Sequence, residues 1–190
     1  MAVRQPALVT ADEFEAYIAR PEHRERNFEL IDGVIVEKAM PTDEHVLAVG
    51  NLVFFLSLYA REHKLGRPGP ELRIRPSGSQ QNARQPDVSM ILDPSVAIVK
   101  RGAMPLMPDV IAEVKSPDDH YDEMREKAHF YIANGARLVW LFFPGPKIVE
   151  VYRLSEPSDI LTINDSLDGF DVLPGFSVPI REILTESRAG

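Results

Sequence analysis

Two apolar segments of strand length, residues 109–115 and 137–143, are separated by a predicted helix at about 119–134. Gly135 fits the end of that helix in the left-handed conformation. Strands that alternate with helices in this way form a sheet whose faces are buried by the helices. The succession therefore predicts an α/β or α+β fold, with a central mixed β-sheet flanked by helices.

The remaining predicted elements extend this core and place an additional unit before it. Thr10 and Glu13 have the spacing of a capping box, which predicts a short helix at about 11–19. Asp32-Gly33 lies between the apolar runs FELI and VIVEK and is typical of a β-hairpin. The other predictions are a helix from 43 to about 64, strands at 71–76, 86–92 and 148–153, and a strand-like C-terminal region with a turn at Pro174-Gly175.

Length and composition limit the kind of protein. The 190 residues fit one domain, predicted as 1–190. The sequence has no cysteine, which excludes disulfides and thiolate metal sites and suits a cytoplasmic location. The apolar run at 46–60 is too short to span a bilayer and has charged neighbours, so we expect a buried helix and no membrane partner. The formal net charge of −8 argues against a protein that holds nucleic acid mainly through phosphate contacts.

Charged residues interrupt the apolar segment at 109–115. Because side chains alternate along a strand, Glu113 and Lys115 share one face of it. If the strand at 86–92 is its antiparallel neighbour, Asp87 lies opposite its end, close to both charged residues. Two carboxylates and a lysine are the groups that metal-assisted hydrolysis of a phosphodiester requires.

These residues suggest a metal site at the strand ends. Asp87, Glu113 and the backbone carbonyl of Val114 are the candidate ligands of one Mg²⁺ or Mn²⁺ ion. Mg²⁺ takes carboxylate and carbonyl oxygens and keeps several waters. A neighbouring ammonium group stabilises the charge of the transition state or orients the attacking water.

Pro86-Asp87 followed by Glu113-Val114-Lys115 resembles the signature of the PD-(D/E)XK nuclease superfamily, and the order of elements resembles its restriction-endonuclease-like core. The chain is more closely similar to the Uma-two family of endonucleases. This resemblance extends from about Phe28 to Leu184. The segments that carry it are FELIDG, QPDVSMI, PDVIAEVKSP, REKAHFYIANGARLVWLF and LPGFSVPIREIL.

The resemblance implies roles for individual residues. Asp87 and Glu113 match the metal carboxylates, and Lys115 matches the superfamily lysine. Many members of the Uma-two family instead carry the lysine on the following helix, at the position of Lys127. This chain has both lysines, and Lys115 is slightly favoured because it requires no assumption about which way a helix faces. Additional candidates for the metal shell are Glu29, Glu44 and His45.

Structural alternatives stay open for several of these residues. Glu113 and Lys115 are also consistent with a surface pair at a strand end, and Lys127 with Glu123 is consistent with an ordinary i,i+4 helix pair. The second Pro-Asp dipeptide, 108–109, is expected to be structural. In the core, Val110, Ala112 and Val114 are expected to be buried beneath the long helix at 43–64, together with Val139 and Leu141.

The expected function is Mg²⁺-dependent endonucleolytic cleavage of DNA, with a homodimer expected by analogy with small nucleases of the superfamily. The alternative is a catalytically silent module of the same fold that binds nucleic acid or protein. The acidic net charge favours the silent module, whereas the intact Asp, Glu and Lys positions favour the nuclease.

Overall fold

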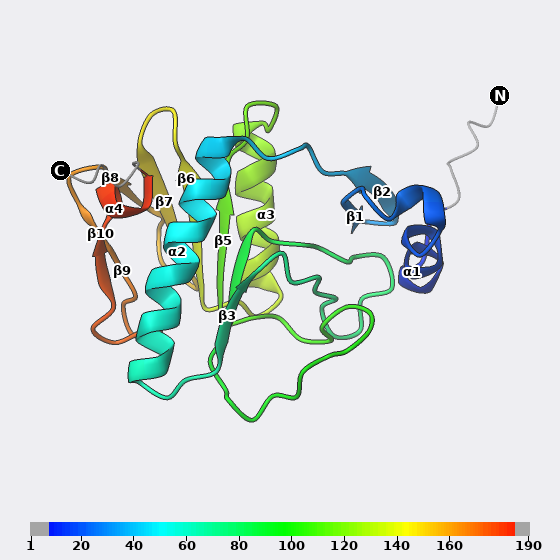
Figure 1. Ribbon diagram of the computed structural model, residues 1–190, viewed down its shortest axis with the longest axis horizontal. Coiled ribbons are helices and arrows are strands. Elements are labelled where there is room, and N and C mark those ends of the chain that lie inside the picture. The colour runs from blue at the N-terminus through cyan, green and yellow to red at the C-terminus, as the bar shows by residue number, and fades with distance from the viewer. Residues whose placement is uncertain (1–7, 185–190) are drawn as a thin grey trace.

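A six-stranded mixed sheet forms the centre of the computed structural model, which describes residues 8–184 (Figure 1). The strand order is β3-β4-β5-β6-β7-β8, in which β5 and β6 are parallel and the other neighbours are antiparallel. The strands are β3 (Arg67–Pro70), β4 (Val88–Ile91), β5 (Val110–Val114), β6 (Leu138–Phe143), β7 (Ile148–Arg153) and β8 (Asp159–Thr162).

Helices cover both faces of this sheet. α2 (Asp43–Glu62) packs on one face and α3 (Tyr121–Ala133) on the other, so that β5 is seen between the two helices in Figure 1. The hairpin of β9 (Ser166–Asp168) and β10 (Ser177–Pro179) and the short α4 (Ile180–Leu184) complete the core on the α2 side. The predicted α/β architecture, a mixed sheet flanked by helices, is confirmed.

The alternation of side chains along β5 divides the core into two layers. Val110, Ala112 and Val114 pack beneath α2 as predicted, whereas Val139 and Leu141 are buried beneath α3. Their predicted place beneath the long helix was wrong. The reason is the register of the parallel pair, because Val110 of β5 is level with Leu138 of β6 and the odd-numbered residues of β6 therefore face α3.

The N-terminal unit consists of α1 (Ala11–Ile18), a 3₁₀ turn (Pro21–His23) and the hairpin of β1 (Phe28–Ile31) and β2 (Val34–Glu37). The predicted capping box at the start of α1 is present. This unit lies to one side of the sheet, at the right of Figure 1, and buries a small core of its own. The main-chain groups of Leu30 and Ala83 bond to each other and link the hairpin to the segment that precedes β4.

Two segments differ from the sequence-based expectation. The strand predicted at 71–76 is absent, and the edge strand β3 lies just before it. Glu71 has a φ of 50°, which turns the chain away from the sheet, so that Ile74 forms isolated bridges only, to Arg84 and Met104. The C-terminal region contains α4 in addition to strands. Among residues 8–184, no helix is both long and apolar enough to cross a membrane.

Candidate active site

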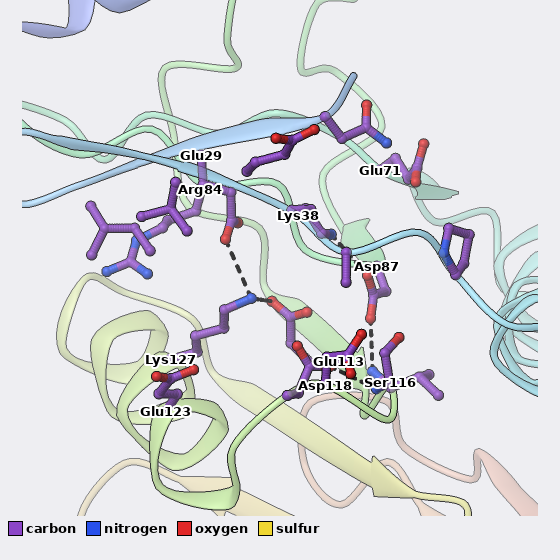
Figure 2. Close-up of a pocket in the computed structure, with 18 of the residues that line it drawn as sticks. Glu29, Lys38, Glu71, Arg84, Asp87, Glu113, Ser116, Asp118, Glu123 and Lys127 are labelled. Carbon is purple, nitrogen blue, oxygen red and sulfur yellow. Dashed lines mark hydrogen bonds and ion pairs between the residues drawn. The ribbon is translucent and has the colours of Figure 1, made fainter. Parts of the chain in front are cut away.

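Asp87 and Glu113 lie at the same end of two neighbouring strands. Val88 pairs with Ala112 in the antiparallel β4–β5 ladder, so that the next positions outward, Asp87 and Glu113, are opposite each other. The two residues are only 5% and 3% exposed. Both line a cavity of about 610 Å³ between the N-terminal hairpin, the β5–α3 turn and α3 (Figure 2).

Three groups surround the carboxylate of Asp87. The amide of Val114 donates a hydrogen bond to Oδ2 (2.8 Å), the ammonium of Lys38 donates one to Oδ1 (3.0 Å), and Nε2 of His45 lies 3.6 Å from Oδ2. Burial acts to raise the pKa of Asp87, but Lys38, His45 and the Val114 amide together bring the pKa below its ordinary value. Asp87 is therefore held in its charged form.

Glu113 has a different environment. The phenol of Tyr131 donates a hydrogen bond to Oε1 (2.6 Å), and the ammonium of Lys127 lies 3.9 Å from the same oxygen. Burial raises the pKa of Glu113 to about 7; the negative charges of Asp87 and Glu29 act in the same direction, and Lys127 opposes them. The two carboxylates that face each other thus differ in their affinity for a proton.

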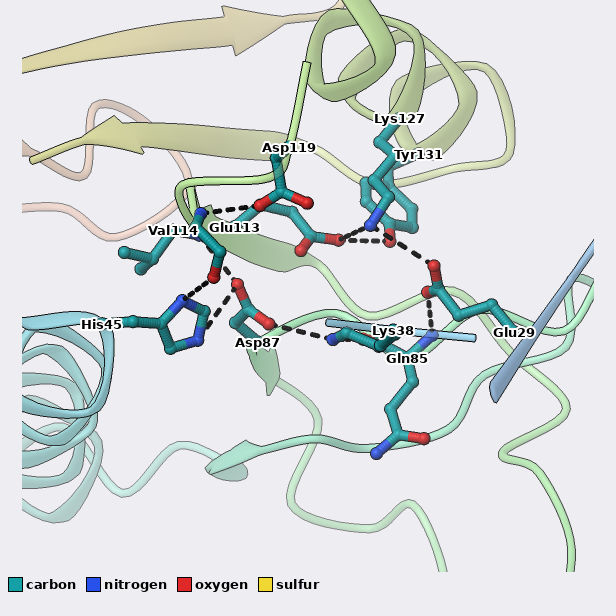
Figure 3. Close-up of polar contacts among 11 residues, drawn as sticks. Glu29, Lys38, His45, Gln85, Asp87, Glu113, Val114, Asp119, Lys127 and Tyr131 are labelled. Atoms are coloured by element: carbon teal, nitrogen blue, oxygen red, sulfur yellow. Dashed lines mark hydrogen bonds and ion pairs between the residues drawn. The ribbon is translucent and has the colours of Figure 1, made fainter. Parts of the chain in front are cut away.

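Lys127 projects from the inward face of α3 between two acids. Its ammonium lies 3.3 Å from Oε2 of Glu29, and Oε1 of that glutamate accepts a hydrogen bond from the amide of Gln85 at 2.7 Å (Figure 3). Burial acts to lower the pKa of Lys127, but Glu113 and Glu29 outweigh it, and the pKa lies well above its usual range. The lysine is therefore a permanently charged group inside the cavity.

Lys38 was not predicted as a site residue. It follows β2, and its ammonium donates hydrogen bonds to the carbonyl of Gln85 (2.8 Å) and to Asp87. Burial acts to lower the pKa of Lys38, but the three neighbouring acids Asp87, Glu113 and Glu29 raise it. No sequence signal distinguishes this lysine, because a Lys in a polar link after a hairpin is typical of solvent-exposed surface.

With this geometry in view, comparison with known proteins places the chain in a family. A family model described as "Putative restriction endonuclease", Uma2, matches residues 11–181. The chain belongs to the Uma2 family. A crystal structure from Anabaena variabilis, described as a "putative nuclease belonging to DUF820", is similar to it with a TM-score of 0.78 and 21% identity, over 93% of this chain and 97% of that one. The comparison with curated proteins gave no match. The resemblance to this family that was inferred from the sequence motifs is confirmed, and the fold is shared with the Anabaena variabilis structure.

In this Uma2 protein the two candidate lysines occupy different places. Lys127 lines the cavity, whereas the ammonium of Lys115 donates to the carbonyls of Ser116 (2.9 Å) and Pro117 (3.4 Å) and lies 5.3 Å from the ring centroid of Tyr121. Lys115 does not line the cavity. β5 ends at Val114, so the strand alternation that predicted Lys115 beside Glu113 stops one residue too early.

The secondary candidates also separate into two groups. Glu29 lines the cavity, as does His45, whose Nδ1 lies 3.2 Å from the hydroxyl of Ser116. Glu44 is exposed at the start of α2 and does not line it. Val114 contributes to the lining and supplies the amide that bonds to Asp87. The structure thus brings together most of the predicted residues, without Lys115 and Glu44.

The lining of the cavity is strongly acidic. Three permanently cationic side chains, those of Lys38, Arg84 and Lys127, face ten carboxylates. These acids are Glu29, Asp32, Glu37, Glu71, Asp87, Glu113, Asp118, Asp119, Glu123 and Glu126. An excess of carboxylates at one concave surface favours cations.

A divalent ion fits the donor chemistry of this cavity. Within residues 8–184, no group of three or more His, Asp or Glu side chains is gathered tightly enough to form a complete metal cage. Mg²⁺, however, is usually held by one or two carboxylates and keeps several waters. The paired carboxylates of Asp87 and Glu113, together with space for water, match that requirement.

Proposed function

We propose that this Uma2 protein is a Mg²⁺-dependent endonuclease that hydrolyses phosphodiester bonds of DNA. The observation that supports this most strongly is the convergence of Asp87, Glu113 and Lys127 on one acidic cavity. Asp87 immediately precedes β4, Glu113 lies in β5 and Lys127 lies in α3, so three different segments contribute to the cavity. A purely structural role does not require three ionisable, largely buried groups to meet in a cavity open to solvent.

Asp87 and Glu113 would hold the ion, together with the backbone carbonyl of Val114; Mn²⁺ would bind in the same way. A bound Mg²⁺ polarises a phosphate oxygen and makes a coordinated water more acidic. Glu113 must lose its proton to serve as a ligand. Its pKa of about 7 allows this near neutral pH.

Lys127 is the lysine that we assign to the reaction. Its permanent charge suits a group that donates hydrogen bonds to a phosphate oxygen or to the attacking water and that stabilises the charge of the transition state. Glu29, itself fixed by the amide of Gln85, holds the ammonium in place. Lys115, the lysine of the superfamily signature, is the competing assignment.

Lys38 and His45 are positioning residues in this proposal. Lys38 fixes Oδ1 of Asp87, while His45 lies beside Oδ2 and is held by Ser116. Both favour the charged form of Asp87, which is the form that binds a cation. A cytoplasmic location and a homodimer belong to the same proposal.

Cleavage of DNA by the purified protein tests the assignment. We expect cleavage of plasmid DNA with Mg²⁺ or Mn²⁺ and none with a chelator, and we expect Asp87→Asn to abolish it. Asp109→Asn is the matched control. Asp109 also follows a proline at the start of a strand segment, but its carboxylate accepts a hydrogen bond from the amide of Leu92 and does not line the cavity.

Equal loss of cleavage in both variants would indicate general destabilisation and would count against the site. If the wild type binds Mn²⁺ but cleaves no form of DNA, the catalytically silent module becomes the better description. Cleavage that survives in Asp87→Asn would remove Asp87 from the reaction.

A further inference from the structure

The outward face of α2 is apolar although it is open to solvent. Val46, Leu47, Phe54 and Leu58 are 53%, 40%, 57% and 50% exposed. The exposed residues of α3, in contrast, are mostly charged or polar, among them Asp122, Glu123, Arg125, Glu126 and His129. Large apolar residues gathered on one exposed helix face mark an interaction surface.

The outward positions of α2 follow the spacing of a helix–helix seam. They are Asp43, Leu47, Gly50, Phe54, Ser57 and Arg61, which are separated alternately by four and three residues. That spacing keeps one row of side chains directed at a partner helix. Large residues at Leu47 and Phe54 alternate with small ones at Gly50 and Ser57.

We propose that α2 docks on α2 of a second copy of this chain, antiparallel, about a two-fold axis at the level of Leu52. In this register Phe54 of each copy is level with Gly50 of the other, Leu47 with Ser57, and Asp43 with Arg61. A two-fold interface requires such self-complementarity, because residue i of each copy contacts residue j of the other copy.

The shapes and charges of the facing residues select this orientation. Apart from the backbone of its own helix, residues 8–184 place no atom within 4 Å of a Cβ added at Gly50, so there is room for the ring of Phe54 from the other copy. Large residues facing small ones allow two helices to pack closely. Asp43 and Arg61 are both exposed, with neither in an ion pair within residues 8–184. Parallel helices would instead place each charge opposite its own like charge.

The proposed dimer leaves both cavities open. His45, which reaches the cavity, lies on the side of α2 opposite to the seam. Because α2 has 20 residues and the helices are antiparallel, the two cavities lie near opposite ends of a helix pair about 30 Å long. The inference does not depend on nuclease activity, and its test needs neither metal nor DNA.

Sedimentation velocity over a concentration series tests the interface. We expect the wild type to sediment with twice the mass of one chain at high concentration, and Phe54→Asp to sediment as one copy at all concentrations. Ile160→Asp is the matched control, since Ile160 is a similarly exposed apolar residue (63%) on β8, away from the seam. Circular dichroism melting verifies that both variants fold.

A charge-exchange series tests the register separately. Asp43→Arg or Arg61→Asp alone should weaken the dimer several-fold, because like charges then face each other, and the double exchange should restore it. A wild type that sediments as one copy throughout overturns the proposal. A Phe54→Asp dimer as tight as the wild type overturns it as well, and failure of the double exchange to restore association overturns the antiparallel register.

Discussion

At the scale of single residues, Glu113 makes the free energy of unfolding depend on pH. Its pKa in the folded protein is about 7, against an ordinary value of 4.5, chiefly because the carboxyl is buried. Between these two values the folded state binds a proton that the unfolded chain does not bind. Glu113 therefore lowers the free energy of unfolding as pH rises from 4.5 to 7, and it makes no such contribution below 4.5.

Glu113→Gln should remove this pH dependence. With a chelator present, the variant should gain stability relative to the wild type as pH rises from 5 to 8, by about 3 kcal/mol at most, since one pKa unit corresponds to about 1.4 kcal/mol. Urea unfolding at several pH values measures the difference. Glu150→Gln is the control, because the Arg125 guanidinium lowers the pKa of the equally buried Glu150, and that variant should lose stability at neutral pH. A Glu113→Gln curve parallel to that of the wild type would contradict the assignment.

The two lysines can be ranked by single substitutions. Lys127→Ala should reduce the rate of DNA cleavage by a factor on the order of 10² or more, as the loss of one preorganised stabilising group does. Lys115→Ala should have a much smaller effect, because its ammonium is bonded to the carbonyls of the β5–α3 turn. The reverse order would show that Lys115 moves into the site during the reaction, and undiminished cleavage by the double variant would exclude both lysines.

At the level of elements, strong local signals predicted much of the fold. The capping box at Thr10, the Asp32-Gly33 turn and the apolar segment at 137–143 each correspond to an observed element. The edge strand β3 was missed because its sequence, Arg-Pro-Gly-Pro, is typical of a turn. Proline is tolerated there since an edge strand does not need every amide for pairing. The register of β5 against β6 was missed because alternation within one strand contains no information about its neighbour.

The same distinction explains which site residues were predicted. Asp87 immediately precedes β4 and Glu113 lies in β5, and the antiparallel pairing that was supposed for these two strands is present. Whether Lys127 reaches the cavity depends on the direction in which α3 faces. Whether Lys38 reaches it depends on how the N-terminal hairpin packs beside β4. Neither relation is local in the sequence. Lys115 was favoured because it required no assumption about which way a helix faces, but β5 ends one residue before it.

Val114→Asp tests the position of β5 in the core. Val114 is 2% exposed beneath α2, and an unpaired carboxylate there should lower the free energy of unfolding by several kcal/mol. Thermal or urea unfolding measures the loss. Ile160→Asp on β8, where the side chain is exposed, should have little effect. A Val114→Asp protein that folds with wild-type stability would contradict the packing of β5.

At the scale of the whole molecule, charge is the dominant property. The net charge is −8, and the cavity itself carries an excess of carboxylates. DNA and this surface repel each other unless cations intervene. In the function that we propose, a bound divalent ion would therefore serve the binding of DNA as well as the chemistry.

DNA affinity should consequently depend on divalent ions even without cleavage. Fluorescence anisotropy with a short duplex should show binding in Ca²⁺, a larger ion that also takes oxygen ligands, and at least tenfold weaker binding in a chelator at the same ionic strength. Asp87→Asn should reduce the difference, and Asp109→Asn should not. Equal affinity in Ca²⁺ and chelator would show that DNA is held elsewhere on the protein.

The most direct measurement of the central claim is the anomalous scattering of Mn²⁺ in crystals of the protein. A single ion between the carboxylates of Asp87 and Glu113, with the ammonium of Lys127 close to its coordinated waters, is the predicted result, and crystals of Asp87→Asn should lack that ion. An ion bound elsewhere, for example between Asp118 and Asp122, with none at Asp87, would contradict the proposed site.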